Sequence, residues 1–202
     1  TILIASLVAL TKDNLKARLA YSTISQLSYI VLGAALANSW GVIGGSMHIA
    51  MHAFGKITLF FCAGAIMVAS HKTEISDMDG IGKTMPVTMF AFLIGSLSVI
   101  GLPPMGGSWS KWYLALGAVD AHQNILVAVL MISSLLNIAY LMPVVARAFF
   151  VAPSKDDDHH HEGIHEAPML CVVPICITAF GCLVLFFCAE DLYRLLLPIA
   201  QP

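Results

Sequence analysis

The chain has 202 residues, of which 58% are hydrophobic and only 11% are charged, and its mean hydropathy is +0.85. Because soluble domains contain about 25% charged residues, this composition excludes a soluble globular domain and predicts an all-α polytopic membrane protein. The formal net charge of −2 favours no particular partner, and no basic block indicates binding to nucleic acid.

The first two predicted helices flank a basic turn. Residues 1–10 have the pattern of a partial transmembrane helix, and because the chain starts at Thr1 rather than an initiator methionine, we expect a fragment of a longer subunit. A polar, basic turn at residues 12–18 precedes a predicted span at 19–37. The span is unusually polar, and the sequence does not decide whether its hydrophilic residues join helices or line a channel. These residues are Ser22, Ser25, Gln26 and Tyr29.

The next predicted span, residues 42–70, carries titratable side chains on one face. His48, His52 and Lys56 interrupt its apolar sequence at positions i, i+4 and i+8. This spacing places them on one side of a helix over roughly 12 Å of its axis. A charged lysine at the bilayer centre costs about 2.5–3.5 kcal/mol on insertion scales, so a ladder of such groups favours a proton path.

The two histidines also allow other interpretations. A pair at i and i+4 can bind zinc, but no third ligand at the same depth is visible, and a b-type haem would need a histidine on a second membrane helix. A packed core histidine is the remaining alternative. We therefore favour proton transfer, and we expect neither a metal site nor a cofactor.

Residues 86–119 are predicted to form one discontinuous transmembrane helix, after a polar loop at 71–85. Two prolines and three glycines within 101–107 cannot continue a helical hydrogen-bond ladder, and each half alone is too short to span a bilayer. Irregular backbone at membrane depth is tolerated where it is buried in protein or lines a wet cavity, as at transporter ion sites. The break consists of Gly101, Pro103, Pro104, Gly106 and Gly107.

Lys111 lies in the first turn of the second half-helix, just after the break. The positive end of the half-helix dipole and burial both disfavour a charged amine at this position. Apolar residues flank it on both sides, so its side chain would have far to reach to the membrane surface. We therefore predict that Lys111, like Lys56, exchanges protons.

The last third of the chain contains two further predicted spans. Residues 125–150 form one, with Asn137 and Tyr140 as further channel-lining candidates and Pro143 as a predicted kink. A hydrophilic loop at 151–167 contains His159–His161, which we interpret as a solvated linker rather than a metal site. Residues 168–202 form a trailing transmembrane helix and an amphipathic interfacial stub.

The distribution of basic residues predicts the orientation in the membrane. Cytoplasmic loops carry an excess of lysine and arginine, so the loops at 71–85 and 151–167 should be cytoplasmic and the turn at 120–124 external. Alternating the loops gives one basic side, with Lys12, Lys16, Arg18, Lys72, Lys83, Arg147 and Lys155, and an opposite side with Arg194 alone.

Four short stretches resemble one protein family in order and spacing. They are Leu19-Ala20-Tyr21-Ser22-Thr23-Ile24-Ser25-Gln26, His52-Ala53-Phe54-Gly55-Lys56 with Leu59-Phe60-Phe61, Gly101-Leu102-Pro103-Pro104, and Ser110-Lys111. The chain resembles the antiporter-like subunits shared by complex I (NADH:quinone oxidoreductase subunits L, M and N) and Mrp-type Na⁺/H⁺ antiporters. The resemblance covers roughly residues 1–150, and the stretch from Ser110 to Leu114 is most similar to the D-type member of the Mrp antiporters. Subunit L typically has an acid directly after the lysine that matches Lys111, whereas Trp112 follows here.

The resemblance implies a fold and a set of roles. The family has two inverted five-helix repeats, and this chain would contain the second repeat (1–150) and the trailing helix, the C-terminal half only. The positions that match Lys56 and Lys111 are the central and exit-side lysines of a proton path, connected by those that match His48 and His52. The family also implies a multi-pass protein of the inner (plasma) membrane that contacts the lipid bilayer and other membrane subunits.

These observations lead to a functional prediction with one main alternative. We predict a proton-translocating subunit of a multisubunit cation/proton antiporter, which moves H⁺ and, in the antiporter branch, Na⁺. The alternative is the proton-pumping membrane arm of an NADH:quinone oxidoreductase-like complex, in which this subunit has no redox centre of its own. A membrane scaffold that conducts nothing is disfavoured, because apolar residues would anchor a partner at lower cost than buried lysines.

Overall fold

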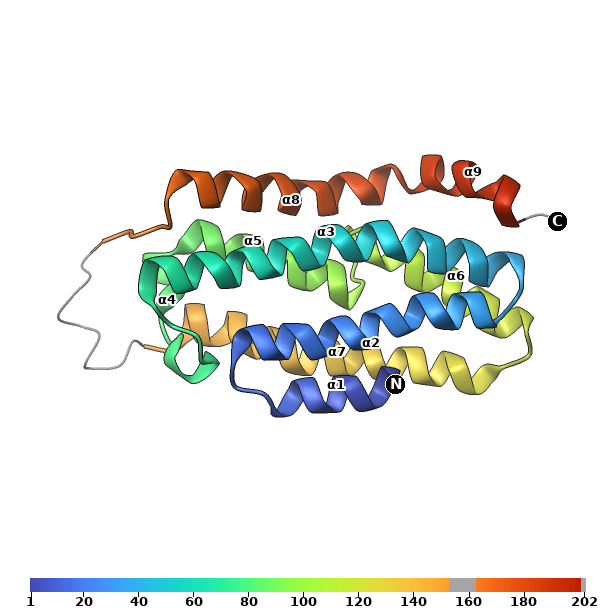
Figure 1. Cartoon of the computed structure of the whole chain (residues 1–202), viewed down its shortest axis with the longest axis horizontal. Helices are drawn as coiled ribbons and strands as arrows, with labels where there is room; N and C mark the ends of the chain where they lie inside the picture. Colours follow the sequence, from blue (N-terminus) through green and yellow to red (C-terminus); the bar gives the residue numbers. More distant parts are fainter. Residues whose placement is uncertain (153–162, 201–202) are drawn as a thin grey trace.

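A computed structural model describes residues 1–152 and 163–200, and in these ranges the chain consists of helices and loops, with one isolated bridge between Asn14 and Glu74. The long helices lie side by side along one axis (Figure 1). Their bounds are α1 (Ile2–Thr11), α2 (Leu15–Ala35), α3 (Ser39–Ser70), η1 (a 3₁₀ turn, Ile75–Asp77), α4 (Ile81–Thr84), α5 (Pro86–Ile100), α6 (Gly107–Asp120), α7 (Asn124–Phe150), α8 (Met169–Phe187) and α9 (Ala189–Ala200).

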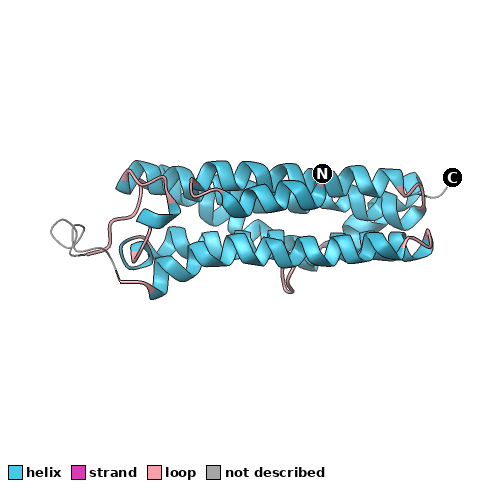
Figure 2. Ribbon diagram, turned by 90° about the horizontal axis from the view of Figure 1, so that it is seen from below, coloured by secondary structure: helices cyan, strands magenta, loops and turns pink. Residues whose placement is uncertain are grey.

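Three of the described helices, α3, α7 and α8, are individually long and apolar enough to cross a membrane. Helices α5 and α6 are shorter, and they follow one another with a break about midway along the bundle (Figures 1 and 2). The predicted all-α membrane bundle with one discontinuous helix is therefore confirmed. The division into a five-helix repeat and a trailing helix stays a prediction.

The helix after the first turn begins earlier than the sequence indicated. Helix α2 starts at Leu15, not at residue 19, because the side chain of Asn14 accepts a hydrogen bond from the Ala17 backbone N–H at 3.0 Å and caps the helix. Most of the expected basic turn is thus helical, and Lys16 and Arg18 belong to α2. Helix α3 likewise starts at Ser39, because Asn38 caps it in the same way.

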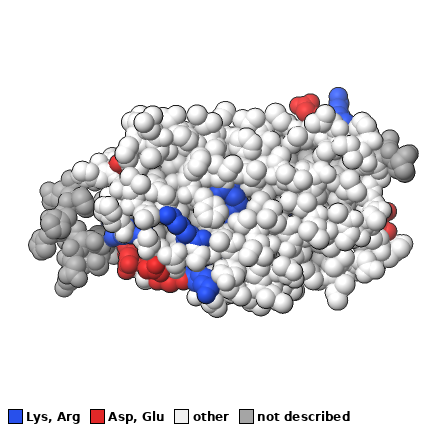
Figure 3. Space-filling model, in the orientation of Figure 1, with Lys and Arg blue, Asp and Glu red and all other residues white. Residues whose placement is uncertain are grey.

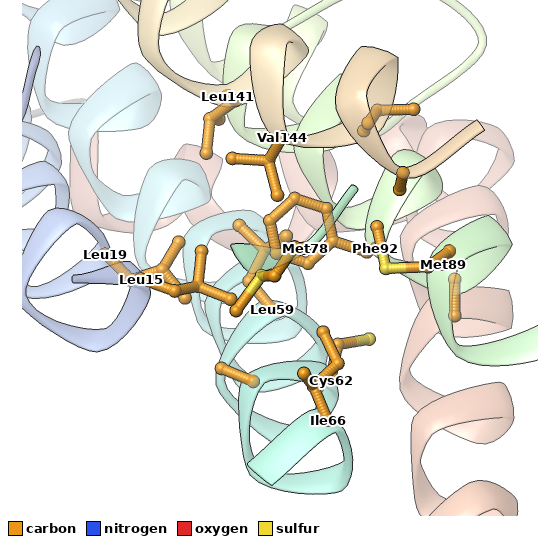
Figure 4. Close-up of a cluster of buried hydrophobic side chains, with 14 of the residues drawn as sticks. Leu15, Leu19, Leu59, Cys62, Ile66, Met78, Met89, Phe92, Leu141 and Val144 are labelled. Atoms are coloured by element: carbon orange, nitrogen blue, oxygen red, sulfur yellow. The ribbon is translucent and has the colours of Figure 1, made fainter. Parts of the chain in front are cut away.

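A large apolar cluster packs between the helices from the 71–85 loop to the end of α5, and Figure 4 shows part of it. It joins side chains mainly from α2, α3, α5 and α7, with contributions from α1, α4 and α8, and it also includes Met78 from the loop between α3 and α4. This packing holds the helices together between the 71–85 loop and the middle of the molecule. The labelled members are Leu15, Leu19, Leu59, Cys62, Ile66, Met78, Met89, Phe92, Leu141 and Val144.

Polar contacts attach the 71–85 loop to its neighbours at the same end. The guanidinium of Arg147 in α7 bonds both carboxylate oxygens of Asp79, at 2.7 and 3.0 Å. The carboxylate of Asp13 accepts from the Ser76 hydroxyl at 2.6 Å. On the face shown in Figure 3, charged side chains gather toward this end and most of the surface is uncharged, as expected for a surface in lipid.

The break between α5 and α6 depends on close backbone contacts. Gly101 ends α5 in the left-handed region, at φ 87°, which favours glycine. A Cβ on Gly107 would overlap the carbonyl oxygen of Ser98, so only glycine allows α6 to start where it does. Helix α8 supports the break from outside, because the Cys182 carbonyl accepts from the Gly106 N–H at 3.1 Å.

Candidate functional site

The titratable face of α3 points into the bundle. His48, His52 and Lys56 are 2%, 7% and 5% exposed, so all three are buried as the sequence predicted for this face. The two imidazole rings stack with their centroids 5.6 Å apart. The structure therefore brings the predicted ladder together in the interior.

Lys56 is hydrogen-bonded to α2. Its Nζ donates to the Leu19 carbonyl at 3.2 Å and to Ser22 Oγ at 2.6 Å. The chain of contacts continues to α7, because Ser22 Oγ lies 2.7 Å from the Tyr140 hydroxyl, which in turn donates to Asn137 Oδ1. Three of the predicted channel-lining residues thus extend from the Lys56 amine.

The order of these hydrogen bonds is determined by counting hydrogens. Tyr140 uses its single hydroxyl hydrogen on Asn137, so it accepts from Ser22. Ser22 then has only lone pairs to offer Lys56. The arrangement presents an oxygen acceptor to Lys56, which suits a protonated amine.

Lys111 is held at the end of α5 by the helix break itself. The last carbonyls of a helix lack partners within it, and the Lys111 Nζ donates to the Ile100 carbonyl at 2.8 Å. It also donates to Ser134 Oγ of α7 at 3.2 Å and lies 5.3 Å from the centre of the Tyr29 ring. A mostly apolar groove of 470 Å³ between α6 and α7 opens beside it. Lys111 therefore lies between this groove and the interior of the bundle.

His48 connects α3 to the start of α6. Its Nδ1 lies 2.9 Å from Ser110 Oγ, and Ser110 donates its hydrogen to the Gly107 carbonyl at 3.1 Å. We infer that Nδ1 of the neutral ring carries the hydrogen, which leaves Nε2 as a free acceptor. Since Ser110 precedes Lys111, this contact brings the histidine ladder next to the second lysine.

Several buried polar atoms between the two lysines have no hydrogen-bond partner among the described residues. Buried polar groups in proteins are normally satisfied by protein or by ordered water, so this region is polar enough to be hydrated. A hydrated interior would let protons pass between groups that do not touch. The unpartnered atoms in this region are Gln26 Oε1 and Nε2, Tyr29 Oη, His48 Nε2, His52 Nδ1 and Asn137 Nδ2.

Not every predicted polar residue lies on this path. Ser25 bonds to Ser6 Oγ at 2.8 Å and to the Ile2 carbonyl at 2.8 Å, both in α1. Its contacts are those of a residue that joins two helices, the alternative that the sequence left open. Ser22, in contrast, contacts Lys56 directly.

No metal centre is formed by the residues that the structure describes. Within 1–152 and 163–200 there is no group of three histidine, cysteine, aspartate or glutamate side chains that could hold a metal ion. His159–His161 lie outside the described residues.

Sequence reasoning missed three polar contacts of this site. Ser110 and Ser134 bond to His48 and Lys111 from helices that the sequence could not place beside them. The sequence predicted a loop position for Arg18, yet its side chain is 9% exposed and donates from Nη1 to the Tyr140 carbonyl at 3.0 Å. Its spacing of four residues before Ser22, on the same helical face, is the signal that could have identified it.

The sequence of this chain matches a known family model and several curated proteins. Residues 1–137 match the family model described as NADH:quinone oxidoreductase/Mrp antiporter, TM. The NADH-quinone oxidoreductase subunit N of Desulforudis audaxviator is 36% identical over 209 residues, which cover 100% of this chain and 42% of that protein. The D-type component of the Na(+)/H(+) antiporter of Alkalihalophilus pseudofirmus is 28% identical, and the match covers 100% of this chain and 40% of that protein.

Solved structures share the fold. A chain of the Mrp complex from a Dietzia species superposes with a TM-score of 0.88 at 24% identity, over 96% of this chain and 44% of that one. A chain of respiratory complex I from Thermus thermophilus superposes with a TM-score of 0.85 at 22% identity, over 99% of this chain and 41% of that one. The chain thus spans less than half the length of these relatives. Its sequence match over residues 1–137 shows that it belongs to the NADH:quinone oxidoreductase/Mrp antiporter transmembrane family, as its motifs predicted.

Proposed function

We propose that this chain is part of a proton-translocating subunit of a multisubunit cation/proton antiporter. The observation that carries the proposal is the pair of lysines inside the bundle, Lys56 buried and Lys111 partly buried, each bonded to oxygen acceptors, with the stacked rings of His48 and His52 on the helix that carries Lys56. Burying a lysine without a carboxylate partner is costly, so a role that uses the titration of the amine is the simplest reason for both.

The proposed transfer uses each group as both acceptor and donor. A proton on Lys56 passes to the neighbouring imidazole of His52, then to His48, and from there toward the amine of Lys111 beside Ser110. Intervening water in the polar interior would bridge the steps that exceed hydrogen-bond distance. Because two nearby positive charges repel, protonation of one lysine favours release from the other.

The main alternative is a membrane arm driven by a redox reaction elsewhere in the complex. It is supported by the 36% identity to an NADH-quinone oxidoreductase subunit. In both cases the subunit would work with other membrane subunits in the inner (plasma) membrane, with the loops 71–85 and 151–167 on the cytoplasmic side. A gradient of Na⁺ that drives H⁺ movement in vesicles supports the antiporter, whereas H⁺ movement only on addition of NADH supports the alternative.

The proposal is tested by removing each lysine charge in the full-length complex, reconstituted in vesicles with a pH-sensitive dye inside. Lys56→Met and Lys111→Met should assemble normally, because they remove a buried charge, and should slow proton-coupled transport by about 100-fold or more. Lys56→Arg should also fail, since arginine keeps its proton at any accessible pH. Lys16→Met, at an exposed lysine of α2, is the matched control and should transport like the parent.

Two results would contradict the proposal. Parent-like transport in both methionine variants would show that protons do not use the lysines. If Lys56→Arg transports like the parent and Lys56→Met assembles poorly, Lys56 is instead a structural cation.

A further inference from the structure

Arg18 lies where α2 meets α7, and it is the other buried cation beside the Lys56 network. Its Nε donates to the Lys12 carbonyl at 2.7 Å and its Nη1 donates to the Tyr140 carbonyl at 3.0 Å. The residue next to it, Leu19, supplies a carbonyl to Lys56. Arg18 therefore connects the end of α1, the start of α2 and the middle of α7.

The contact with Tyr140 matters because α2 and α7 have little direct packing. Helix α7 packs mainly against α1, α5 and α6. Its approach to α2 at Tyr140 is made by side chains: Arg18 bonds the Tyr140 backbone, and Ser22 bonds the Tyr140 hydroxyl at 2.7 Å. The two contacts come from residues one helical turn apart on α2. They bond the backbone carbonyl and the side-chain hydroxyl of the same α7 residue.

The position of the Tyr140 hydroxyl determines what Ser22 can offer to Lys56. The hydrogen bond from Ser22 to Tyr140 fixes the orientation of the Ser22 hydroxyl, with its lone pairs directed at the amine. If the Tyr140 turn moved away from α2, the Ser22 hydroxyl would lose this acceptor and could rotate, for example toward the carbonyl four residues back, so its lone pairs would no longer be held toward Lys56. A small displacement of α7 would thus change the hydrogen bonding of the Lys56 amine.

Pro143 lies in α7 one turn after Tyr140, where a proline weakens the helical hydrogen-bond ladder. It lacks a backbone N–H and crowds the preceding turn, which includes Tyr140. A loosened turn is less rigid than regular helix, so a tether from a neighbouring helix has more effect there. The guanidinium, with donors on two edges, reaches the Tyr140 and Lys12 carbonyls together.

We propose that Arg18 is a positioning residue of the proton path, which tethers the Tyr140 turn of α7 to α2 and so keeps Ser22 as the acceptor for Lys56. This inference rests on the proposed function, because it assigns a role within the same path. If Arg18 only stabilised the fold, its effect on transport would not depend on Tyr140. As a positioning residue, Arg18 should affect transport only while the Tyr140 hydroxyl is present.

A double-mutant cycle in the full-length reconstituted complex tests this dependence, with transport rates divided by the amount of assembled complex. Arg18→Gln and Tyr140→Phe should each slow transport by about tenfold, the factor that ~1.4 kcal/mol in a barrier produces. The double variant should be no slower than Tyr140→Phe alone, because Arg18 then positions a side chain without a hydroxyl. Lys16→Gln removes the same charge from an exposed site two residues away and should leave transport unchanged.

A conservative variant keeps the test decisive if Arg18→Gln assembles poorly. Arg18→Lys retains a buried cation but not the forked donors, and it should slow transport by about threefold in the parent and not at all in the Tyr140→Phe background. The proposal would be overturned if the effect of Arg18→Gln or of Arg18→Lys simply added to that of Tyr140→Phe. Parent-like transport in Arg18→Gln, or an equal loss of transport in Lys16→Gln, would also overturn it. If Lys56→Met abolishes transport while the cycle is additive, only the role of Arg18 fails. If Lys56→Met transports normally, the proposed path itself fails.

Discussion

At the scale of single residues, each of the two lysine amines inside the bundle bonds to a carbonyl and to a serine hydroxyl. Lys56 has the Leu19 carbonyl and Ser22, and Lys111 has the Ile100 carbonyl and Ser134. The Ile100 carbonyl is available only because the helix stops there. Without the break, that carbonyl would bond within its own helix and Lys111 would lose its strongest acceptor.

The close approach of Gly107 to Ser98 leads to a prediction about stability. Gly107→Ala places a Cβ against a backbone oxygen, so α6 must shift, and we expect a loss of about 1–3 kcal/mol of stability together with reduced transport. Gly64→Ala in α3 is the control: nothing lies within 4 Å of its added Cβ, and it should be neutral or stabilising by up to about 1 kcal/mol. Thermal unfolding of the purified protein in detergent compares the two. Equal unfolding temperatures would contradict the contact between the two half-helices.

At the scale of elements, the discontinuous helix is held by residues far from it in sequence. Helix α5 has no side-chain cap of its own at Met85. Instead the carboxylate of Glu166, just before α8, accepts from the Val87 N–H at 2.6 Å and from the Thr88 hydroxyl at 2.6 Å. The segment before the trailing helix thus caps the first half of the broken helix, and α8 bonds the break itself through Cys182.

Removal of this cap should destabilise the bundle. Glu166→Ala leaves the first N–H groups of α5 without an acceptor, so we expect a loss of about 1 kcal/mol, within the range measured for helix caps. Glu190→Ala in α9 breaks an exposed ion pair with Arg194 and should cost no more than about 0.5 kcal/mol. Both are measured by thermal unfolding in the same detergent. A Glu166→Ala protein as stable as the Glu190→Ala protein would show that the cap contributes nothing.

At the scale of the whole molecule, the exposed charged side chains and the buried polar side chains lie in different parts of the bundle. Charged residues of the loops gather at the end that contains the 71–85 loop, where Arg147 pairs with Asp79. His48, His52 and Lys56 are buried in the interior, and the apolar cluster reaches them at Leu19 and Tyr140. This separation suits a membrane protein, whose exposed charges gather where the chain leaves the bilayer.

The orientation is testable by labelling from one side. In a full-length protein with its native cysteines replaced, a cysteine at His122 should react with an impermeant thiol reagent added outside, because the 120–124 turn is predicted to be external. A cysteine at the exposed Lys83, in the 71–85 loop, should react only after the membrane is permeabilised. The reverse pattern would overturn the predicted orientation.

The amino-acid sequence by itself determined the class of protein, the break and the candidates for proton transfer. These features are local or compositional: apolar runs predict spans, prolines and glycines interrupt a helix, and the i, i+4, i+8 spacing puts His48, His52 and Lys56 on one face. The helix boundaries were predicted less well, since the start of α2 depends on the Asn14 cap.

Only the tertiary structure decided which groups those candidates contact. The contact between His48 and Ser110 joins residues 62 positions apart, and the Arg18 contact with Tyr140 joins residues 122 positions apart. Helical periodicity orients a side chain relative to its own helix, but it does not say which helix packs against that face. For this reason Ser25 and Ser22, equivalent by sequence, have different surroundings: one joins α2 to α1, and the other is the hydrogen-bond acceptor of Lys56.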